Sequence, residues 1–532
     1  MTDTRRLILR GGTVVDGSGA PARRADVVVV GGRIAFVSRR NESAVGPSLT
    51  SEAAEVLDVS GLVVAPGFHD VHTHLDLALL AEPAYLDGLR QGVTTVHIAQ
   101  CGLGFAPASV ATQALFRDYL AGICGDLVLP AWRSVEEYLA LFDRAAALNT
   151  VFLIPHSLLR AEVAGMTLGP LTPPQLDRMK RLAAEAMEQG ARGISTGLTY
   201  FPGSEADLDE LVAVSRVVAE HGGVYVSHLR NYSDGLLDAI DEACEIGRRA
   251  GLPVQISHLR PQAAFRGRAR EVLDHVEAAR DRGIDVAFDL YTYLKGCTLM
   301  AALFLPPQVY AGGIEAAIDR LKDAGERQWL SRSFALPAAM PDVDWSEVHI
   351  ASVGSERNRR FEGLRLPDFA AARGADVLGA CLDLLIEERL RVAVVGWPIE
   401  DSDHSAVLAH PLCLVGSDTI PVGGARHPRA SGTFARYLGH YVRERGLIPL
   451  EEAVRRITSV PAHRYGFDDR GLVAEGQVAD LAVFDPATII DRATYEHPRR
   501  LADGVRHVLV NGRLVLRDGE LTEERPGAVL RG

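Results

Sequence analysis

Residues 67–76 read GFHDVHTHLD, and they directly follow the apolar run Leu62, Val63, Val64, Ala65 and Pro66. The run has no helical spacing, so it indicates a buried strand that ends in imidazoles. His72 and His74 are two positions apart, so on an extended chain both side chains point to the same side and can share one metal ion. A histidine-rich loop at a strand end has the same letters. The rest of the chain has to decide between the two interpretations.

The composition narrows the class of protein. The chain has 532 residues, of which 56 are basic and 69 acidic, and its formal charge is −13. This balance argues against a nucleic-acid or anionic-membrane partner, and no run approaches the roughly 18 apolar residues of a membrane span. The six cysteines have no paired spacings, so we expect no disulfide framework. We therefore expect a cytoplasmic protein that acts on a small molecule, and the sequence does not indicate an oligomeric state.

The two ends of the chain have the same texture. Residues 6–60 and the last part of the chain contain short apolar runs between turns rich in Gly, Asp and Ser, which is typical of an antiparallel sheet. We predict that residues 1–61 and 467–532 together form one small β-sandwich.

The middle of the chain, residues 62–466, alternates apolar strands with amphipathic helices, which is typical of a parallel sheet built from βα units. Helices are expected within 173–190, 206–223 and 235–251, each closed by a glycine. The eight candidate strands are Leu62–His72, Thr94–Cys101, Val151–Ser157, Gly193–Tyr200, Val224–Arg230, Val254–Arg260, Asp285–Tyr293 and Leu412–Asp418. Eight such units predict an α/β protein with a (β/α)8 TIM-like barrel.

The last two candidate strands are separated by far more residues than one helix needs. Residues 298–360 are therefore predicted to be an inserted subdomain or lid before strand eight. Residues 376–389, DVLGACLDLLIEER, are predicted to resume the barrel as one of its helices.

Chemically reactive side chains stand at the ends of several candidate strands, and in such a barrel these ends form the active site. A thiolate together with imidazoles favours zinc over magnesium or calcium. A lone buried histidine is more often a packed core residue, but several ligand types at equivalent places are hard to explain by packing. The residues are His72, His74, Cys101, His228, His258 and Asp418.

At this point the sequence resembles the amidohydrolase superfamily and, within it, the D-aminoacylase or N-acyl-D-amino-acid deacylase family. The resemblance covers nearly the whole chain, through segments such as APGFHDVHTH, GISTGLTYFPG, GGVYVSHLR and GGARHPRASGTFARYLG. His-x-His is shared widely in the superfamily. The cysteine on strand two and the HPR-x-x-GTF segment are more specific to this family.

The resemblance implies a set of roles. It implies a tightly held Zn²⁺ at Cys101, His228 and His258, and a second, weaker metal position at His72 and His74. Asp418 matches the catalytic aspartate. The residues implied to contact the substrate, with Arg429 and Arg260 on its α-carboxylate, are Arg429, Arg260, Tyr291, Tyr200 and Cys297.

Some positions depart from the family pattern, and they concern the substrate rather than the reaction. Arg260 stands where the family often has lysine, and these two cations are not interchangeable. Thr292, Cys297, Phe201 and residues 155–157 (Pro-His-Ser) also differ from the usual residues.

The function hypothesis is hydrolysis of the amide bond of N-acyl-D-amino acids, or of related D-configured peptides, by a zinc-activated water with Asp418 as general base and acid. The alternative is a cyclic amide hydrolase of the dihydropyrimidinase or hydantoinase type. Those enzymes carry a carboxylated lysine on strand four, whereas this chain has GISTG at 193–197. A second alternative is a binding protein without catalysis, which the intact set of metal ligands and Asp418 disfavours.

Overall fold

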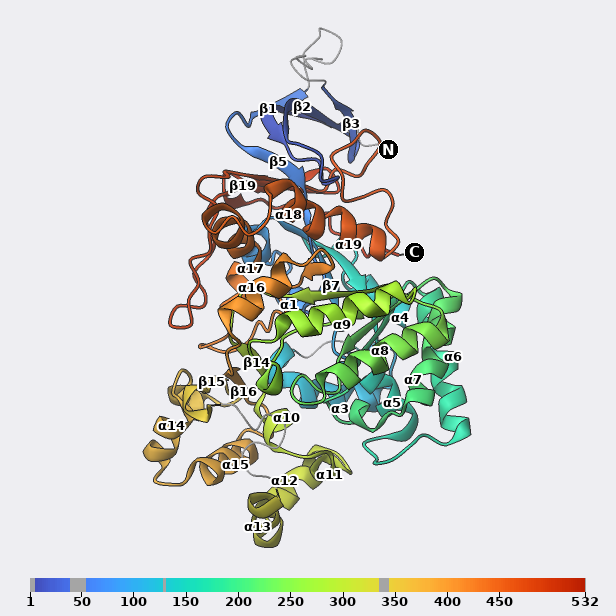
Figure 1. The fold of residues 1–532 in the computed structure, drawn as a ribbon, viewed down its shortest axis with the longest axis vertical. Coiled ribbons are helices and arrows are strands. Elements are labelled where there is room, and N and C mark those ends of the chain that lie inside the picture. Colours follow the sequence, from blue (N-terminus) through green and yellow to red (C-terminus); the bar gives the residue numbers. More distant parts are fainter. Residues whose placement is uncertain (1–4, 39–53, 128–130, 334–343, 532) are drawn as a thin grey trace.

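The computed structural model describes residues 5–38, 54–127, 131–333 and 344–531. It is an α/β structure with three regions along its long axis: a β-rich end that holds both termini, a central region of strands and surrounding helices, and a smaller region at the far end (Figure 1). The predicted α/β class is confirmed.

Strands from both ends of the chain form one sheet of nine strands. Its central member, β5 (Val63–Pro66), pairs in parallel with β1 and antiparallel with β18, and so joins the two ends. The predicted sandwich is therefore one continuous sheet, with a core that includes Leu9, Val27, Val64 and Leu481. Residues 1–4, 39–53 and 532 of the predicted region lie outside the described residues. The other strands are β1 (Arg6–Val14), β2 (Arg23–Val30), β3 (Arg33–Val37), β4 (Ala54–Asp58), β18 (Leu481–Phe484), β19 (Val505–Val510), β20 (Arg513–Arg517) and β21 (Glu520–Leu521).

The prediction that Leu62–His72 is one barrel strand was wrong. Its first half is β5 of the terminal sheet, and only β6 (Phe68–Asp70) pairs with the next central strand. The change of sheet occurs at Gly67, where an added Cβ would lie 2.2 Å from the Thr94 side chain. Because both halves are fully buried, the apolar pattern does not show the change.

The central strands are parallel and form two sheets with the orders β17-β13-β12-β11-β10-β9 and β6-β7-β8. Strands β8 and β9 are separated by one residue, and the Asp418 amide donates to the carbonyl of His72 between β17 and β6 (2.7 Å). All the carboxyl ends thus lie at one edge. The strands are β6, β7 (Val93–Ile98), β8 (Asn149–Phe152), β9 (Ile154–Pro155), β10 (Gly193–Gly197), β11 (Val224–His228), β12 (Val254–Ile256), β13 (Val286–Leu290) and β17 (Cys413–Val415).

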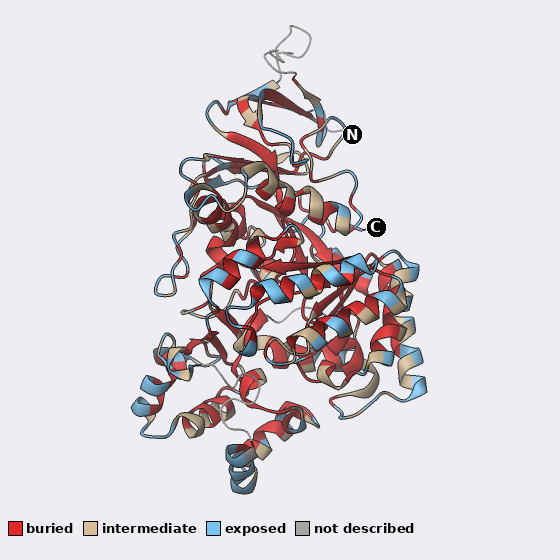
Figure 2. Ribbon diagram, viewed as in Figure 1, coloured by how far each residue is buried: buried red, intermediate tan, exposed pale blue. Residues whose placement is uncertain are grey.

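Amphipathic helices surround these strands, with their buried faces inward and exposed faces outward (Figure 2). The three predicted helices are confirmed as α6 (Pro173–Glu188), α7 (Leu208–Glu220) and α8 (Leu236–Ala250). Outside the inserted region, the other described helices are α1 (Ala78–Ala81), α2 (Leu86–Leu89), α3 (Val110–Cys124), α4 (Val135–Ala140), α5 (His156–Ala164), η1 (Gly203–Glu205), η2 (Ala263–Phe265), α9 (Ala269–Asp281), α16 (Asp401–Ala409), α17 (Arg429–Arg436), η5 (Tyr437–Glu444), α18 (Leu450–Ile457) and α19 (Ser459–Arg464).

The inserted region is larger than predicted. Strands β14 (Gly296–Leu299), β15 (His349–Ser352) and β16 (Ala393–Gly396) form an antiparallel sheet, so the insertion extends to Gly396. Residues 334–343 of the predicted insertion lie outside the described residues. The helices of this region are α10 (Met300–Phe304), α11 (Pro307–Tyr310), α12 (Ile314–Lys322), α13 (Ala324–Ser333), η3 (Trp345–Glu347), η4 (Glu356–Phe361), α14 (Leu366–Arg373) and α15 (Val377–Glu387).

The prediction that residues 376–389 resume the barrel was wrong. Helix α15 packs against α14 and α12 of the insertion, and α16 is the next helix that lies on the central strands. Helix α15 buries Ala380, Cys381, Leu382, Leu384 and Leu385. Such a helix has the same sequence pattern whichever core it joins.

In the described parts of the chain, no helix combines the length and the apolar character that crossing a bilayer requires. All six cysteines lie within the described residues, and each is buried with a free thiol.

Candidate metal centre and active site

The strand ends bring the predicted ligand residues together. His72 and His74 follow β6, Cys101 follows β7, His228 ends β11 and His258 follows β12. Four of these side chains are buried and that of His228 is half-buried. Gly197 at the end of β10 allows the approach, because a Cβ there would lie 2.0 Å from the carbonyl oxygen of Cys101.

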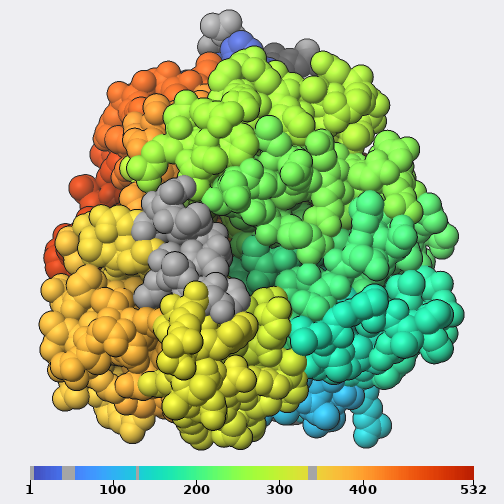
Figure 3. Space-filling model, turned by 60° about the horizontal axis from the view of Figure 1, so that its bottom comes forward, coloured from blue at the N-terminus to red at the C-terminus, as the bar shows by residue number. Residues whose placement is uncertain are grey.

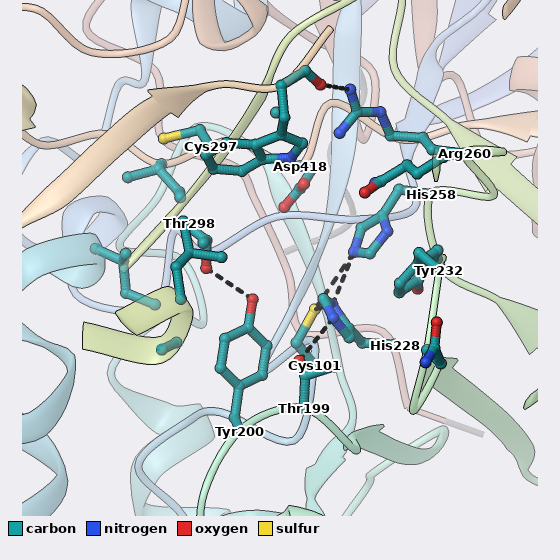
Figure 4. Close-up of a pocket in the computed structure, with 18 of the residues that line it drawn as sticks. Cys101, Thr199, Tyr200, His228, Tyr232, His258, Arg260, Cys297, Thr298 and Asp418 are labelled. Atoms are coloured by element: carbon teal, nitrogen blue, oxygen red, sulfur yellow. Dashed lines mark hydrogen bonds between the residues drawn. The ribbon is translucent and has the colours of Figure 1, made fainter. Parts of the chain in front are cut away.

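The Cys101 thiol lies at the centre of the cluster (Figure 4). Its Sγ is 3.3 Å from His72 Nε2, 3.7 Å from His228 Nδ1 and 3.9 Å from His258 Nε2. The two last nitrogens are 3.1 Å apart.

Two sets of three donors share Cys101: one with His72 and His74, and one with His228 and His258. In each set the donor atoms lie within 4.8 Å of one another. A thiol with imidazoles at this spacing fits a transition-metal ion such as zinc.

Two residues that the sequence analysis missed hold the imidazoles in place. The Thr199 Oγ1 is 2.9 Å from His228 Nε2, which leaves Nδ1 facing Cys101. Asp289 accepts a hydrogen bond from the His258 amide (2.8 Å), and its Oδ1 is 3.5 Å from His72 Nδ1. Metal-binding histidines are commonly oriented by such partners. Asp289 lies inside the seventh predicted strand. A carboxylate in an otherwise apolar strand was the sequence signal that could have identified it as a site residue.

The electrostatics of the cluster favour an ionised thiol. Burial opposes ionisation of Cys101, but the charge of His72 and hydrogen bonds from His228 and His258 hold its pKa well below the usual value. The thiolate is the form of cysteine that binds metals.

Three residues of the cluster have strained backbones. Cys101, His258 and Asp418 have φ angles of +56°, +33° and +51°. Residues other than glycine rarely adopt this region, and such strain concentrates at functional sites. The tight turns after β7, β12 and β17 direct the three side chains to one place.

Asp418 connects the ligand cluster to the predicted substrate residues. Its Oδ1 is 3.3 Å from His74 Nε2, and its Oδ2 is 2.8 Å from Arg429 Nη1. Burial opposes ionisation of Asp418, but Arg429 and His72 hold its pKa well below the usual value.

A cavity of about 260 Å³ opens above the cluster. Four of the predicted substrate residues line it: Tyr200, Arg260, Tyr291 and Cys297. The fifth, Arg429, is fully buried and is not among the described lining residues; its guanidinium lies 4.6 Å from the centre of the Tyr291 ring. Figure 3 shows the surface hollowed between the insertion, in yellow, and the green segments of the central region.

The insertion contributes to the cavity wall. Thr298 of β14 contacts Tyr200 through a hydrogen bond of 2.8 Å (Figure 4). Ala302 and Leu303 of α10 also line the cavity. Of the positions that depart from the family pattern, Cys297 and Arg260 line the cavity, whereas Thr292 and Phe201 do not.

These features define a protein of the amidohydrolase family, and the model of that family matches residues 55–516. The chain belongs to this family. It is 36% identical to a D-aminoacylase of Alcaligenes xylosoxydans xylosoxydans, over 98% of this chain and 97% of the relative. The resemblance drawn from the sequence is confirmed.

Solved structures of similar proteins support the same family assignment. One is the N-acyl-D-glutamate deacylase of Bordetella bronchiseptica complexed with zinc and a phosphonate inhibitor that mimics the tetrahedral intermediate. It covers 100% of both chains, with 32% identity and a TM-score of 0.82. A D-aminoacylase with a binuclear metal centre covers 99% of both chains, with 33% identity and a TM-score of 0.82. A dihydropyrimidinase of Brevibacillus agri is 14% identical with a TM-score of 0.57 over 99% of this chain and 100% of its own, which shows the fold alone.

Proposed function

We propose that the protein is a zinc-dependent hydrolase of N-acyl-D-amino acids that releases a carboxylate and a free D-amino acid. The observation that carries the proposal is the meeting of two three-donor sets and Asp418 at the floor of one cavity. The full-length relatives are named for this class of reaction. We infer that the central strands act as a complete (β/α)8 frame and that the insertion serves as a lid.

We propose that the two donor sets differ in their affinity for zinc. Cys101, His228 and His258 would hold the tighter zinc, and His72 and His74 with Cys101 a second, weaker one. A D-aminoacylase with a binuclear centre supports two positions. When bound, zinc acts as a Lewis acid that makes water more acidic and polarises a carbonyl group.

Asp418 is the proposed general base and acid. Its carboxylate takes a proton from the attacking water and returns it to the amide nitrogen as the C–N bond breaks, because the nitrogen would otherwise have to leave as an anion. The Arg429 ion pair keeps the carboxylate ionised and holds Oδ2, while Oδ1 faces His74. Each turnover thus restores Asp418 to its starting state.

The substrate carboxylate has two candidate partners. Arg429 is already neutralised by Asp418, whereas Arg260 lines the cavity and lies over the Tyr291 ring at 5.4 Å. We therefore assign the α-carboxylate to Arg260 and Tyr291, and assign Arg429 to hold Asp418. Guanidinium groups suit carboxylates because of their planar fork of donors.

The test is a hydrolysis panel of N-acetyl-D-amino acids and their L-counterparts with zinc-loaded protein. We expect cleavage of D-substrates at rates far above those of the L-forms. Equal rates for both enantiomers would overturn the stereochemical part of the proposal. Hydrolysis of dihydrouracil or a hydantoin in place of every linear amide would favour the cyclic-amide alternative, which the absence of a lysine from β10 disfavours.

A further inference from the structure

The cavity wall carries positive charge at two places. Of the residues that the structure describes, Arg230 and Arg260 line the cavity, and no lysine does. Their surroundings differ in a way that bears on the charge of the substrate.

Arg230 is neutralised by the protein. Its Nε and Nη2 donate to the Glu242 carboxylate at 3.0 and 2.8 Å. Its Nη1 and Nη2 also donate to the carbonyl oxygens of Ser204 and Ala206, both at 2.9 Å. Glu242 neutralises its charge, and four of its five N–H groups already donate within the protein, so Arg230 offers a ligand at most one hydrogen bond and no unpaired charge.

Arg260 is not neutralised. It is only 3% exposed, and its Nη2 donates to two neutral carbonyl oxygens, those of Leu294 (2.6 Å) and Trp397 (3.1 Å). Among the described residues no carboxylate lies within ion-pair distance of it, and its Nε has no hydrogen-bond partner. A buried cation of this kind is costly unless an anion pairs with it. The cavity is therefore built to take one negative charge.

Outside the ligand cluster, the rest of the described wall offers no second arginine or lysine that is free to pair with a negative charge. Its side chains are mostly uncharged. The apolar ones include Leu103, Ile123, Leu303 and Ile420, and the polar ones include Thr199, Asn231, Ser233, Gln262 and Thr298. Asp234 also lines the cavity and repels an anion. A second carboxylate would lose its water here without gaining a cation.

From this charge balance we infer that the substrate carries a single carboxylate and that its D-amino-acid side chain is uncharged. The inference rests on the proposed function. It narrows that function to N-acyl derivatives of D-amino acids with uncharged side chains, and it excludes D-glutamate and D-aspartate as good substrates.

The test uses three acetylated substrates of similar length: N-acetyl-D-methionine, N-acetyl-D-glutamine and N-acetyl-D-glutamate. With zinc-loaded enzyme we expect kcat/KM for the methionine derivative to exceed that for the glutamate derivative by on the order of 100-fold or more. The glutamine derivative should lie closer to the methionine derivative than to the glutamate derivative, because its side chain is uncharged.

The possible outcomes distinguish a failure of this inference from a failure of the proposed deacylase function. Comparable or faster cleavage of N-acetyl-D-glutamate would overturn the inference and support the deacylase function. If the enzyme cleaves neither these three substrates nor any other N-acetyl-D-amino acid, both the inference and the deacylase function are overturned.

A variant tests the charge argument directly. Glu242→Gln keeps the shape of the side chain but leaves Arg230 without its counter-ion. The ratio of kcat/KM for the glutamate derivative to that for the glutamine derivative should rise about tenfold in this variant. This ratio does not depend on the fraction of folded enzyme. An unchanged ratio in an active variant would contradict the role given to Glu242.

Discussion

Arg429 and Asp418 form an ion pair, with 2.8 Å between Arg429 Nη1 and Asp418 Oδ2, in a part of the site where both side chains are buried. They come from the start of α17 and from the turn after β17. The pair fixes the carboxylate beside the two donor sets and uses the positive charge that the sequence assigned to the substrate. Substitutions of Arg429, which holds Asp418, and of Arg260, which is free to bind the substrate carboxylate, should therefore have different kinetic effects.

Replacing Arg429 by Met should lower kcat for N-acetyl-D-leucine by about 10–100-fold and change KM little, because Asp418 loses its orientation. Steady-state kinetics separate the two constants. The control is Arg436→Met, which removes another ion pair from α17, that with Asp491. A large rise in KM with kcat kept would instead return the substrate carboxylate to Arg429.

Replacing Arg260 by Gln should raise KM for N-acetyl-D-leucine by about 10–100-fold, because a charge-assisted hydrogen bond is lost. The matched substrate is N-acetyl-D-leucinamide, which has no carboxylate. Wild type and variant should process the amide alike, and a variant that is equally impaired with both substrates would show that Arg260 does not bind the carboxylate.

Replacing Asp418 by Asn should lower kcat by about 10²–10⁴-fold, because the amide cannot accept the proton of water. Zinc content, measured by atomic spectroscopy, should stay near that of wild type. Activity close to wild type would remove Asp418 from the role of general base.

The two donor sets should differ in affinity. Cys101→Ala should lose most of the bound zinc because it removes a ligand from both sets. His72→Ala combined with His74→Ala should retain most of it. Cys244→Ala, which changes a buried cysteine on α8, is the control for general damage. Loss of zinc in the double histidine variant and retention in Cys101→Ala would reverse the ranking.

Glu210 lies in a buried cluster with His156 and Arg160, and the His156 Nε2 is 2.9 Å from Glu210 Oε1. Replacing Glu210 by Gln leaves Arg160 without its counter-ion and should destabilise the fold by about 3–5 kcal/mol. Thermal unfolding measures the loss, and Glu220→Gln at the exposed end of the same helix is the control.

The contribution of Glu210 to the stability of the fold should depend on pH. Burial opposes its ionisation, but the hydrogen bond from His156 and the charge of Arg160 lower its pKa below the usual 4.5. A carboxyl with a depressed folded-state pKa stabilises the protein above its unfolded pKa, and this contribution is lost as the pH falls through the folded-state pKa. The stability gap between wild type and Glu210→Gln should therefore be largest near pH 7 and shrink in acid. A gap that grows in acid would contradict the assignment.

Much of the fold could be predicted because strands and helices leave periodic patterns. The central strands and helices α6 to α8 follow those patterns closely. Two assignments failed for one reason: a pattern of apolar residues reports burial but not the partner. Residues 63–66 are buried in the terminal sheet, and α15 is buried in the insertion, and neither fact is visible along the chain.

By itself, the sequence determined which chemistry is present: His72 and His74 at a strand end, Cys101 in a glycine-rich turn, and Asp418 after the last strand. Those identities follow from residue types and from the common direction of parallel strands. Only the tertiary structure decided how charges are compensated, because ion pairs depend on side chains that are close in space. It placed Glu242 against Arg230, Asp418 against Arg429, and no carboxylate of the described chain against Arg260. That difference is what gives the three arginines separate roles.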